Sequence, residues 1–186
     1  LCYITKRIDR NPGGSKNHLI DFMQILELDD KYKGTMERLG KSIGELSANS
    51  LLDKLRFFEL AVFNYLIGNN DMHLKNFSLY SQRKGYYSLT PGYDMISTAL
   101  LMPEDTEELA LTLNGKRRKI KRSDFEVAMN SCSLEKKIID NLFSKFTKVA
   151  EKWLEFIDIS FLPKEMKQQY KLIITRKYQS FFDAQI

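Results

Sequence analysis

The sequence has few of the residues that build disulfide frameworks or zinc sites. Of its 186 residues, only two are cysteines, Cys2 and Cys132, and only two are histidines, His18 and His73. Two cysteines so far apart argue against a disulfide framework, and no third ligand stands at zinc spacing from either histidine. The low thiol content fits a reducing compartment, so we expect a cytoplasmic protein.

Long apolar runs are also missing. Charged residues interrupt every apolar stretch well before the roughly 18 residues of a membrane-spanning helix, and no signal-peptide pattern opens the chain. The sequence therefore predicts no membrane segment. The first residue is Leu1 and not a methionine, and residues 3–7 already have the pattern of a strand. We expect a fragment that begins inside a structural unit.

The remaining composition is that of a globular domain with a basic surplus. Hydrophobic residues make up 43% of the chain, aromatic residues 12% and charged residues 28%, which argues against intrinsic disorder. The 29 Lys and Arg residues exceed the 24 Asp and Glu residues, and the formal net charge is +5. A surplus of this size suits a polyanionic partner without identifying one.

Apolar spacing predicts a mainly helical fold. Helical periodicity covers residues 18–26, 35–46, 50–67, 134–157 and 163–182. The helix over residues 50–67 is apolar on nearly all sides in its second half, so we place it at the centre of the domain. Strands are predicted over residues 77–80, 86–89 and 109–113, and the last is followed by the turn dipeptide Asn114-Gly115.

The loop over residues 68–76 carries a dense group of polar side chains. Asn76 follows Asp71 by five residues, and Asp94 comes after the predicted hairpin. This spacing is used for phosphoryl transfer, in which one carboxylate accepts the proton of the attacking hydroxyl. An Asn and a second Asp then offer oxygens to Mg²⁺. Lys75 is placed to meet phosphate charge, although it also fits a solvated loop lysine.

The same residues carry a family resemblance. The segments Gly68-Asn69-Asn70-Asp71-Met72-His73-Leu74-Lys75-Asn76-Phe77-Ser78 and Tyr93-Asp94-Met95-Ile96-Ser97 resemble the catalytic core of HipA-type serine/threonine kinases. These kinases are the toxins of bacterial HipA/HipB toxin–antitoxin modules. The run Lys6-Arg7-Ile8-Asp9-Arg10 resembles the hinge strand of that family. The resemblance covers most of the chain and is weakest in its last third.

The resemblance implies a role for each site residue. Asp71 would accept the proton of the acceptor hydroxyl, and Asn76 and Asp94 would bind Mg²⁺. The phosphates of ATP would be lined by four consecutive residues, His73, Leu74, Lys75 and Asn76. Tyr93 would lie beside the nucleotide. Adenine would hydrogen-bond to the backbone of the hinge residues Lys6, Arg7 and Ile8.

The resemblance also implies the fold class and the domain organisation. The fold would be mainly α (α+β): the C-terminal lobe of a protein kinase, with a short N-terminal hinge strand and a small β-hairpin at the catalytic loop. Residues 1–16 would form the hinge strand and a loop, and residues 17–186 the helical lobe, with the catalytic loop at residues 68–97. The N-terminal lobe, with its phosphate-contacting lysine, would be absent.

The implied function is transfer of the γ-phosphoryl group of ATP to a Ser or Thr hydroxyl of a protein. The target would be a translation protein such as an aminoacyl-tRNA synthetase, and a HipB-like antitoxin would restrain the kinase. Two alternatives stay open. One is a non-catalytic kinase-like module that binds an antitoxin or DNA, and the other is a small-molecule phosphotransferase that shares the Asp-to-Asn loop.

Two further features have competing interpretations. The basic run from Lys116 to Arg122 fits either a solvated loop or contact with DNA through an antitoxin complex. His73, Asp71 and Ser78 are close in sequence, but no G-x-S-x-G elbow supports a hydrolase triad. We interpret His73 as a residue that positions the loop through hydrogen bonds.

Overall fold

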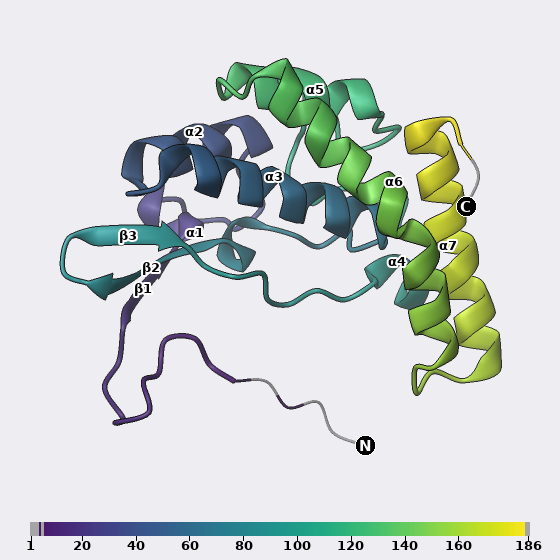
Figure 1. The fold of residues 1–186 in the computed structure, drawn as a ribbon, viewed down its shortest axis with the longest axis horizontal. Coiled ribbons are helices and arrows are strands. Elements are labelled where there is room, and N and C mark those ends of the chain that lie inside the picture. Colours follow the sequence, from purple (N-terminus) through teal and green to yellow (C-terminus); the bar gives the residue numbers. More distant parts are fainter. Residues whose placement is uncertain (1–3, 5, 185–186) are drawn as a thin grey trace.

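A small antiparallel sheet lies beside a larger group of helices in the computed structural model, which describes Ile4 and residues 6–184 (Figure 1). The sheet order is β1-β2-β3, and the strands are β1 (His18–Asp21), β2 (Ser78–Arg83) and β3 (Tyr86–Leu89). β2 and β3 form a hairpin that turns at Gly85, whose φ of 82° favours glycine. β1 pairs with the other edge of β2, with Leu19 opposite Tyr80.

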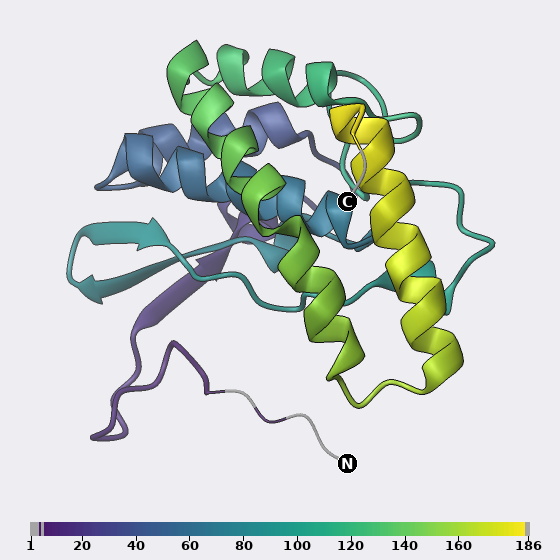
Figure 2. The ribbon, with the colours of Figure 1, turned by 45° about the vertical axis from the view of Figure 1, so that its right-hand side comes forward.

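The helices surround one central helix, α3 (Ser50–Leu66), which contacts α2, α6, α7 and β3. In Figures 1 and 2, α6 crosses over α3 and α7 closes the end of the lobe opposite the hairpin. The other helical elements are α1 (Phe22–Ile25), α2 (Met36–Leu46), η1 (Leu74–Asn76), α4 (Thr98–Leu101), α5 (Arg122–Ser131), α6 (Lys136–Asp158) and α7 (Lys164–Phe182).

The central position of α3 follows from its apolar surface. Phe57, Phe58 and Leu66 are completely buried, and a helix whose second half is apolar on nearly all sides is stable only inside a core. Aromatic contacts connect its C-terminal half to the last third of the chain. The rings of Tyr65 and Phe181 lie 5.4 Å apart, which joins α3 to α7. The helix is therefore a rigid support for the loop that follows it.

Most of the predicted helices are confirmed, and two predicted elements are wrong. Residues 18–21 form β1 and not the start of a helix, because they pair with β2 and because Asp21 accepts a hydrogen bond from Gln24 N, which caps α1. Residues 109–113 form isolated bridges and not a strand, one of them from Thr112 to Thr35. The predicted Asn114-Gly115 turn is confirmed by paired backbone hydrogen bonds between Leu113 and Lys116.

The predicted hinge strand is not found among the residues that the structure describes. Ile4, Lys6, Arg7 and Ile8 are not in a strand, whereas Tyr3 and Thr5 lie outside the described residues. Asp9 accepts two hydrogen bonds of 2.8 Å from the guanidinium of Arg7. In Figures 1 and 2 the segment before β1 runs outside the body of the lobe.

Across the described part of the chain, none of the helices combines the length and the apolar character that a bilayer crossing requires.

A buried carboxylate joins the helices to the small sheet. Asp53, in the first turn of α3, has no exposed surface. Its Oδ2 accepts a hydrogen bond of 2.5 Å from Ser47 Oγ and one of 2.8 Å from Leu89 N. The guanidinium of Arg56 lies 3.6 Å from Oδ1. The acid therefore holds the α2–α3 connection against the end of β3.

We predict that Asp53→Ala lowers the free energy of unfolding by about 2–4 kcal/mol. Hydrogen bonds to a charged acceptor contribute about 1.5–3 kcal/mol, and the variant leaves the buried Leu89 N–H without its acceptor. Urea unfolding measures the change. Asp29→Ala is the control, because that side chain is 83% exposed and contacts Lys33 alone among the described ion pairs; a loss above about 0.5 kcal/mol there would contradict the argument.

Candidate active site

The polar loop begins where α3 ends, and the backbone at that point is fixed by hydrogen bonds. Gly68 N donates to Tyr65 O at 3.2 Å, and Asn69 N donates to Asn64 O at 2.9 Å. This pair of bonds closes a helix through a left-handed residue, and Gly68 has φ of 76°. A Cβ at Gly68 would lie 3.0 Å from the side chains of Ala99 and Ile173. Both the conformation and the close packing therefore require glycine.

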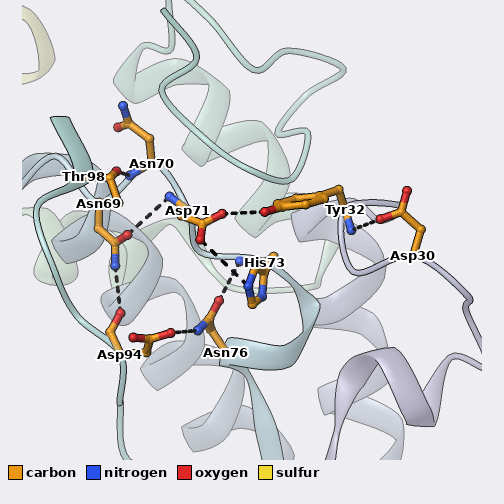
Figure 3. A network of polar contacts seen from close by, with 9 residues as sticks. All are labelled: Asp30, Tyr32, Asn69, Asn70, Asp71, His73, Asn76, Asp94 and Thr98. Carbon is orange, nitrogen blue, oxygen red and sulfur yellow. Dashed lines mark hydrogen bonds and ion pairs between the residues drawn. The ribbon is translucent and has the colours of Figure 1, made fainter. Parts of the chain in front are cut away.

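Two asparagine side chains continue this anchor into the site. Asn69 Nδ2 donates to Asn64 Oδ1 at 2.8 Å and to the backbone oxygen of Asp94 at 3.2 Å. Asn69 Oδ1 accepts a bond of 3.3 Å from Asp71 N. Both asparagines are about 1% exposed. One buried amide thus connects the helix, the loop and the segment that carries Asp94, and Figure 3 shows its bonds to Asp71 and Asp94.

Asp71 lies at the surface of the loop, where a substrate can reach it. Its side chain is 47% exposed, and its Oδ1 accepts a hydrogen bond of 3.0 Å from the Tyr32 hydroxyl. Interaction with Tyr32, together with the charges of Asp71 and Asp94, raises the pKa of the nearby Lys31. The Tyr32 bond orients the carboxylate, and Lys31 places a positive charge close to both acids.

His73 is buried and packs against the same tyrosine. Its ring meets that of Tyr32 edge-on, with the centroids 5.5 Å apart. Burial, reinforced by the charge of Lys31, lowers the pKa of His73, so the ring is neutral near pH 7. Its Nε2 is 4.0 Å from Asp71 Oδ2, which is too long for a hydrogen bond. The hydrogen bond that His73 contributes to the loop comes from its backbone N–H, which donates to Asn76 Oδ1 at 3.0 Å.

Asn76 and Asp94 lie next to each other. Asn76 Nδ2 donates to Asp94 Oδ2 at 2.7 Å (Figure 3), and Asp94 is exposed with φ of 57°. The pair offers hard oxygen donors of the kind that Mg²⁺ prefers. Within the described residues, no three His, Cys, Asp or Glu side chains gather as a metal site. A magnesium ion here would therefore depend on nucleotide oxygens and water for its other ligands.

The remaining predicted nucleotide-binding residues differ in what they offer. The Tyr93 hydroxyl donates to Lys75 O at 2.9 Å and lies 2.6 Å from Ser78 Oγ, which places Tyr93 against the loop. The Lys75 side chain is exposed. The Leu74 side chain is fully buried, and its N–H donates to Lys31 O, so neither group points toward a ligand. Lys6, Arg7 and Ile8 belong to the segment before β1, which runs apart from this loop in Figures 1 and 2.

Three residues of the site have no assigned role in the sequence prediction. Lys31 and Tyr32 reach Asp71 from a loop that precedes it by about forty positions, and a contact over that separation leaves no local signal. Asn64 occupies an apolar helix, where a buried polar side chain is uncommon. A polar residue at an apolar position of the helix could therefore have marked Asn64 as a candidate residue of the site.

Much of the basic run is committed to contacts within the chain. Lys116 Nζ lies 2.7 Å from Asp124 Oδ1, and Arg117 donates to the backbone oxygen of Tyr32 at 2.9 Å. Burial by itself would raise the pKa of Asp124, but hydrogen bonds from Lys116, Asn114 and the backbone of Lys121 outweigh it and lower the pKa. These contacts favour the structural interpretation for that part of the run.

The remaining charges of the run divide in the same way. Arg122 donates to Glu126 Oε1 at 2.9 Å, and its guanidinium lies 4.6 Å from the ring centroid of Phe143. Arg118, Lys119 and Lys121 are exposed. If the run contacts DNA, the contact therefore falls on these three residues.

The family model of the HipA-like C-terminal domain matches residues 1–154. The chain belongs to this family. Among curated relatives, it is 34% identical over 138 residues to "Putative kinase Y4dM" of Sinorhizobium fredii, covering 72% of this chain and 33% of that protein. It is 26% identical over 188 residues to a "Putative kinase" of Haemophilus influenzae, covering 88% of this chain and 55% of that protein.

Solved structures place the HipA-like chain in the same fold. HipA of Shewanella oneidensis, solved with HipB and its operator DNA, superposes with a TM-score of 0.78 at 20% identity and covers 96% of this chain and 48% of HipA. The proinflammatory kinase CtkA of Helicobacter pylori superposes with a TM-score of 0.55 at 18% identity and covers 90% and 67%. The predicted kinase-like lobe is confirmed as a fold. The chain spans between a third and just over half of the length of the two curated relatives.

We predict that His73 titrates below the ordinary histidine pKa of 6.5. Because the unfolded chain then binds more protons than the folded chain, the free energy of unfolding decreases as the pH falls through 6.5 toward the lower folded pKa. Nuclear magnetic resonance titration resolves this readily with two histidines, and His18→Asn identifies the other resonance. His73→Asn should flatten the pH dependence of stability in that window. A midpoint at or above 6.5 would show that the ring is solvated.

Proposed function

We propose that this chain is the catalytic lobe of an ATP-dependent serine/threonine protein kinase of the HipA type. The observation that carries the proposal is the arrangement of Asp71, Asn76 and Asp94. The exposed carboxylate of Asp71 accepts a hydrogen bond from Tyr32. The same loop carries Asn76, which is hydrogen-bonded to Asp94. Membership of the HipA-like family and the kinase names of the curated relatives support the same activity.

In the proposed reaction, Asp71 accepts the proton of a protein hydroxyl as its oxygen bonds to the γ-phosphorus of ATP and the bond to ADP breaks. Because Oδ1 already accepts from Tyr32, the other carboxylate oxygen faces the hydroxyl. Asn76 and Asp94 would hold Mg²⁺, and the ion would supply positive charge to neutralise the phosphates. Lys31 and Lys75 add positive charge at the edge of this site. The Tyr93 hydroxyl supports the loop through its hydrogen bond to Lys75 O.

The biological role is proposed at the level of the family. HipA of Shewanella oneidensis was solved in a complex with HipB and operator DNA, and we infer a HipB-like antitoxin as partner of this chain. DNA contact would then involve Arg118, Lys119 and Lys121, and the acceptor would be a translation protein such as an aminoacyl-tRNA synthetase. A cytoplasmic location stays a prediction. The presence of Asp71, Asn76 and Asp94 together disfavours a non-catalytic module, because such a module does not require these three residues.

We predict that Asp71→Asn lowers the rate of phosphoryl transfer by about 10²- to 10⁴-fold, the contribution typical of a general base. The amide keeps an acceptor for Tyr32 but takes up no proton. The assay follows radiolabel from ATP and Mg²⁺ into a bacterial lysate, using the complete gene product whether or not it extends beyond residues 1–186. Asp29→Asn is the control for the same chemical change, because the Asp29 side chain is 83% exposed and pairs with Lys33. Equal rates for Asp71→Asn and wild type would overturn the assignment.

We predict that Asp94→Ala weakens binding of a non-hydrolysable ATP analogue with Mg²⁺ while the fold is retained. Loss of an outer partner of a metal ligand already costs about 10- to 100-fold in affinity, so loss of a ligand should cost at least as much. Isothermal titration calorimetry measures binding, and thermal unfolding monitors the fold. Asp29→Ala serves as an exposed control. Unchanged affinity in Asp94→Ala would show that the metal lies elsewhere.

A further inference from the structure

A groove lies on the far side of the catalytic loop from the Asn76–Asp94 pair. It has a volume of about 460 Å³ and runs between α4 with the loop after it on one side and α7 on the other. We call it the α4/α7 groove. Leu100 and Pro103 form part of one wall, and Leu172 and Ile173 form part of the other. Leu172 is 53% exposed, so the groove opens to solvent.

Two buried polar atoms in this groove have no hydrogen-bond partner among the described residues. Asn70 is 7% exposed, and its Oδ1 accepts nothing. The Lys177 side chain is 14% exposed, and its Nζ donates to nothing, because Glu108 Oε1 is 4.0 Å away. The ammonium rests 4.3 Å from the centroid of the Tyr65 ring, which supports its charge without accepting a conventional hydrogen bond.

Buried groups without partners are costly, and this cost points to a ligand. A buried donor or acceptor left unpaired costs about 1–3 kcal/mol, and more if it is charged. Burial also lowers the pKa of Lys177, which expresses the same penalty on its charged form. One donor and one acceptor therefore line a single groove, and both would gain a partner from a bound molecule.

The groove is placed on the correct side of Asp71 for an acceptor substrate. Asn70 precedes Asp71, and its backbone N–H donates to Thr98 Oγ1 at 2.8 Å, which ties the loop to the start of α4. Figure 3 shows Asn70 pointing away from Asn76 and Asp94, with Asp71 between them. Phosphoryl transfer requires the attacking oxygen and the leaving oxygen to lie roughly in line on opposite sides of the phosphorus. A molecule in the groove would approach Asp71 from the side opposite the metal ligands.

We propose that the α4/α7 groove binds the protein acceptor as an extended polypeptide segment, with Lys177 Nζ donating to a main-chain carbonyl and Asn70 Oδ1 accepting from a main-chain N–H. The segment places a Ser or Thr hydroxyl at Asp71. Its oxygen forms the bond to the γ-phosphorus as the bond to ADP breaks, and its proton passes to Asp71. This proposal rests on the proposed kinase function and names its substrate class and two binding residues.

The lining of the groove favours a polypeptide over a phosphorylated or anionic small molecule. The three acids Asp105, Glu107 and Glu108 outnumber the two cations Arg176 and Lys177 in the lining, so the groove disfavours an anionic ligand. The Leu172 and Ile173 side chains offer apolar surface for a substrate side chain. Alternating main-chain N–H and C=O groups of an extended segment match one acceptor and one donor within the same groove.

The test measures kinetics on a library of peptides with a fixed central serine and degenerate flanking positions, using the complete gene product with ATP and Mg²⁺. In Lys177→Met and Asn70→Ala, we expect the KM for peptide to rise about tenfold, as for one lost hydrogen bond in a buried site. The KM for ATP should stay within about twofold. Lys177→Gln keeps a donor and should restore part of the loss. Lys171→Met is the matched control on α7, because Lys171 pairs with Asp158 and does not line the groove.

A second measurement is independent of catalysis. Leu172 is replaced by the photo-cross-linker p-benzoylphenylalanine, and cross-links to the same peptides are counted with and without Lys177→Met. We expect cross-links in the wild-type background and their loss in the variant. Leu172→Arg, at an exposed position that does not disturb the core, should raise the peptide KM even if a variant at Lys177 fails to fold.

The outcomes separate the two proposals. Absence of transfer by wild type overturns the kinase function, and the cross-links alone then test the groove. Full transfer by Asp71→Asn overturns the role of Asp71 as the proton acceptor, and with it the placement of the acceptor hydroxyl at that residue. Active wild type with an unchanged peptide KM in Lys177→Met, Asn70→Ala and Leu172→Arg overturns the groove. Cross-links that persist in Lys177→Met overturn the role of that lysine. A parallel rise in the KM for ATP and for peptide indicates a structural effect and also counts against the groove.

Discussion

At the C-terminal end of α3 the chain reverses through Gly68, and two buried asparagine side chains hold that reversal in place. The backbone of Asn69 bonds to the helix at Asn64, while its side chain reaches both Asn64 and the carbonyl of Asp94. Because α3 is buried in the middle of the lobe, the loop inherits the rigidity of the core. The positions of Asp71 and Asp94 therefore depend on one helix end. A change in that end would move the two halves of the site together.

The polar groups around this anchor fall into two classes. Most have partners, as when Asn76 bonds to both the His73 backbone and the Asp94 carboxylate. The buried atoms without a partner among the described residues include Asn70 Oδ1 and Lys177 Nζ, and also His73 Nδ1 and Ser97 Oγ. A satisfied network fixes geometry, and an unsatisfied group retains the capacity to bind. Asn70 and Lys177 differ from the other two because both line the α4/α7 groove.

Charge shows how a sequence pattern can be correct as a pattern and still be divided by the fold. The run from Lys116 to Arg122 is basic along its whole length, but three of its side chains contact acids or carbonyls within the lobe. Arg117 in particular bonds to the backbone of Tyr32, the residue that orients Asp71. Through Arg117, the run therefore helps to hold Tyr32 beside Asp71. A count of charges carries no information about which of them already have partners.

The helical class, the central helix, the hairpin and the polar loop over residues 68–76 could be predicted from the sequence. Those features depend on periodicity, turn chemistry and a dense local motif, all of which lie within short stretches of chain. Tertiary structure alone decided that residues 18–21 are a strand, because a strand requires the distant partner β2. It also decided that Tyr32 and Lys31 reach Asp71, and that Asn70 and Lys177 share a groove. Contacts between residues far apart in sequence arise when elements pack, and no local pattern encodes them.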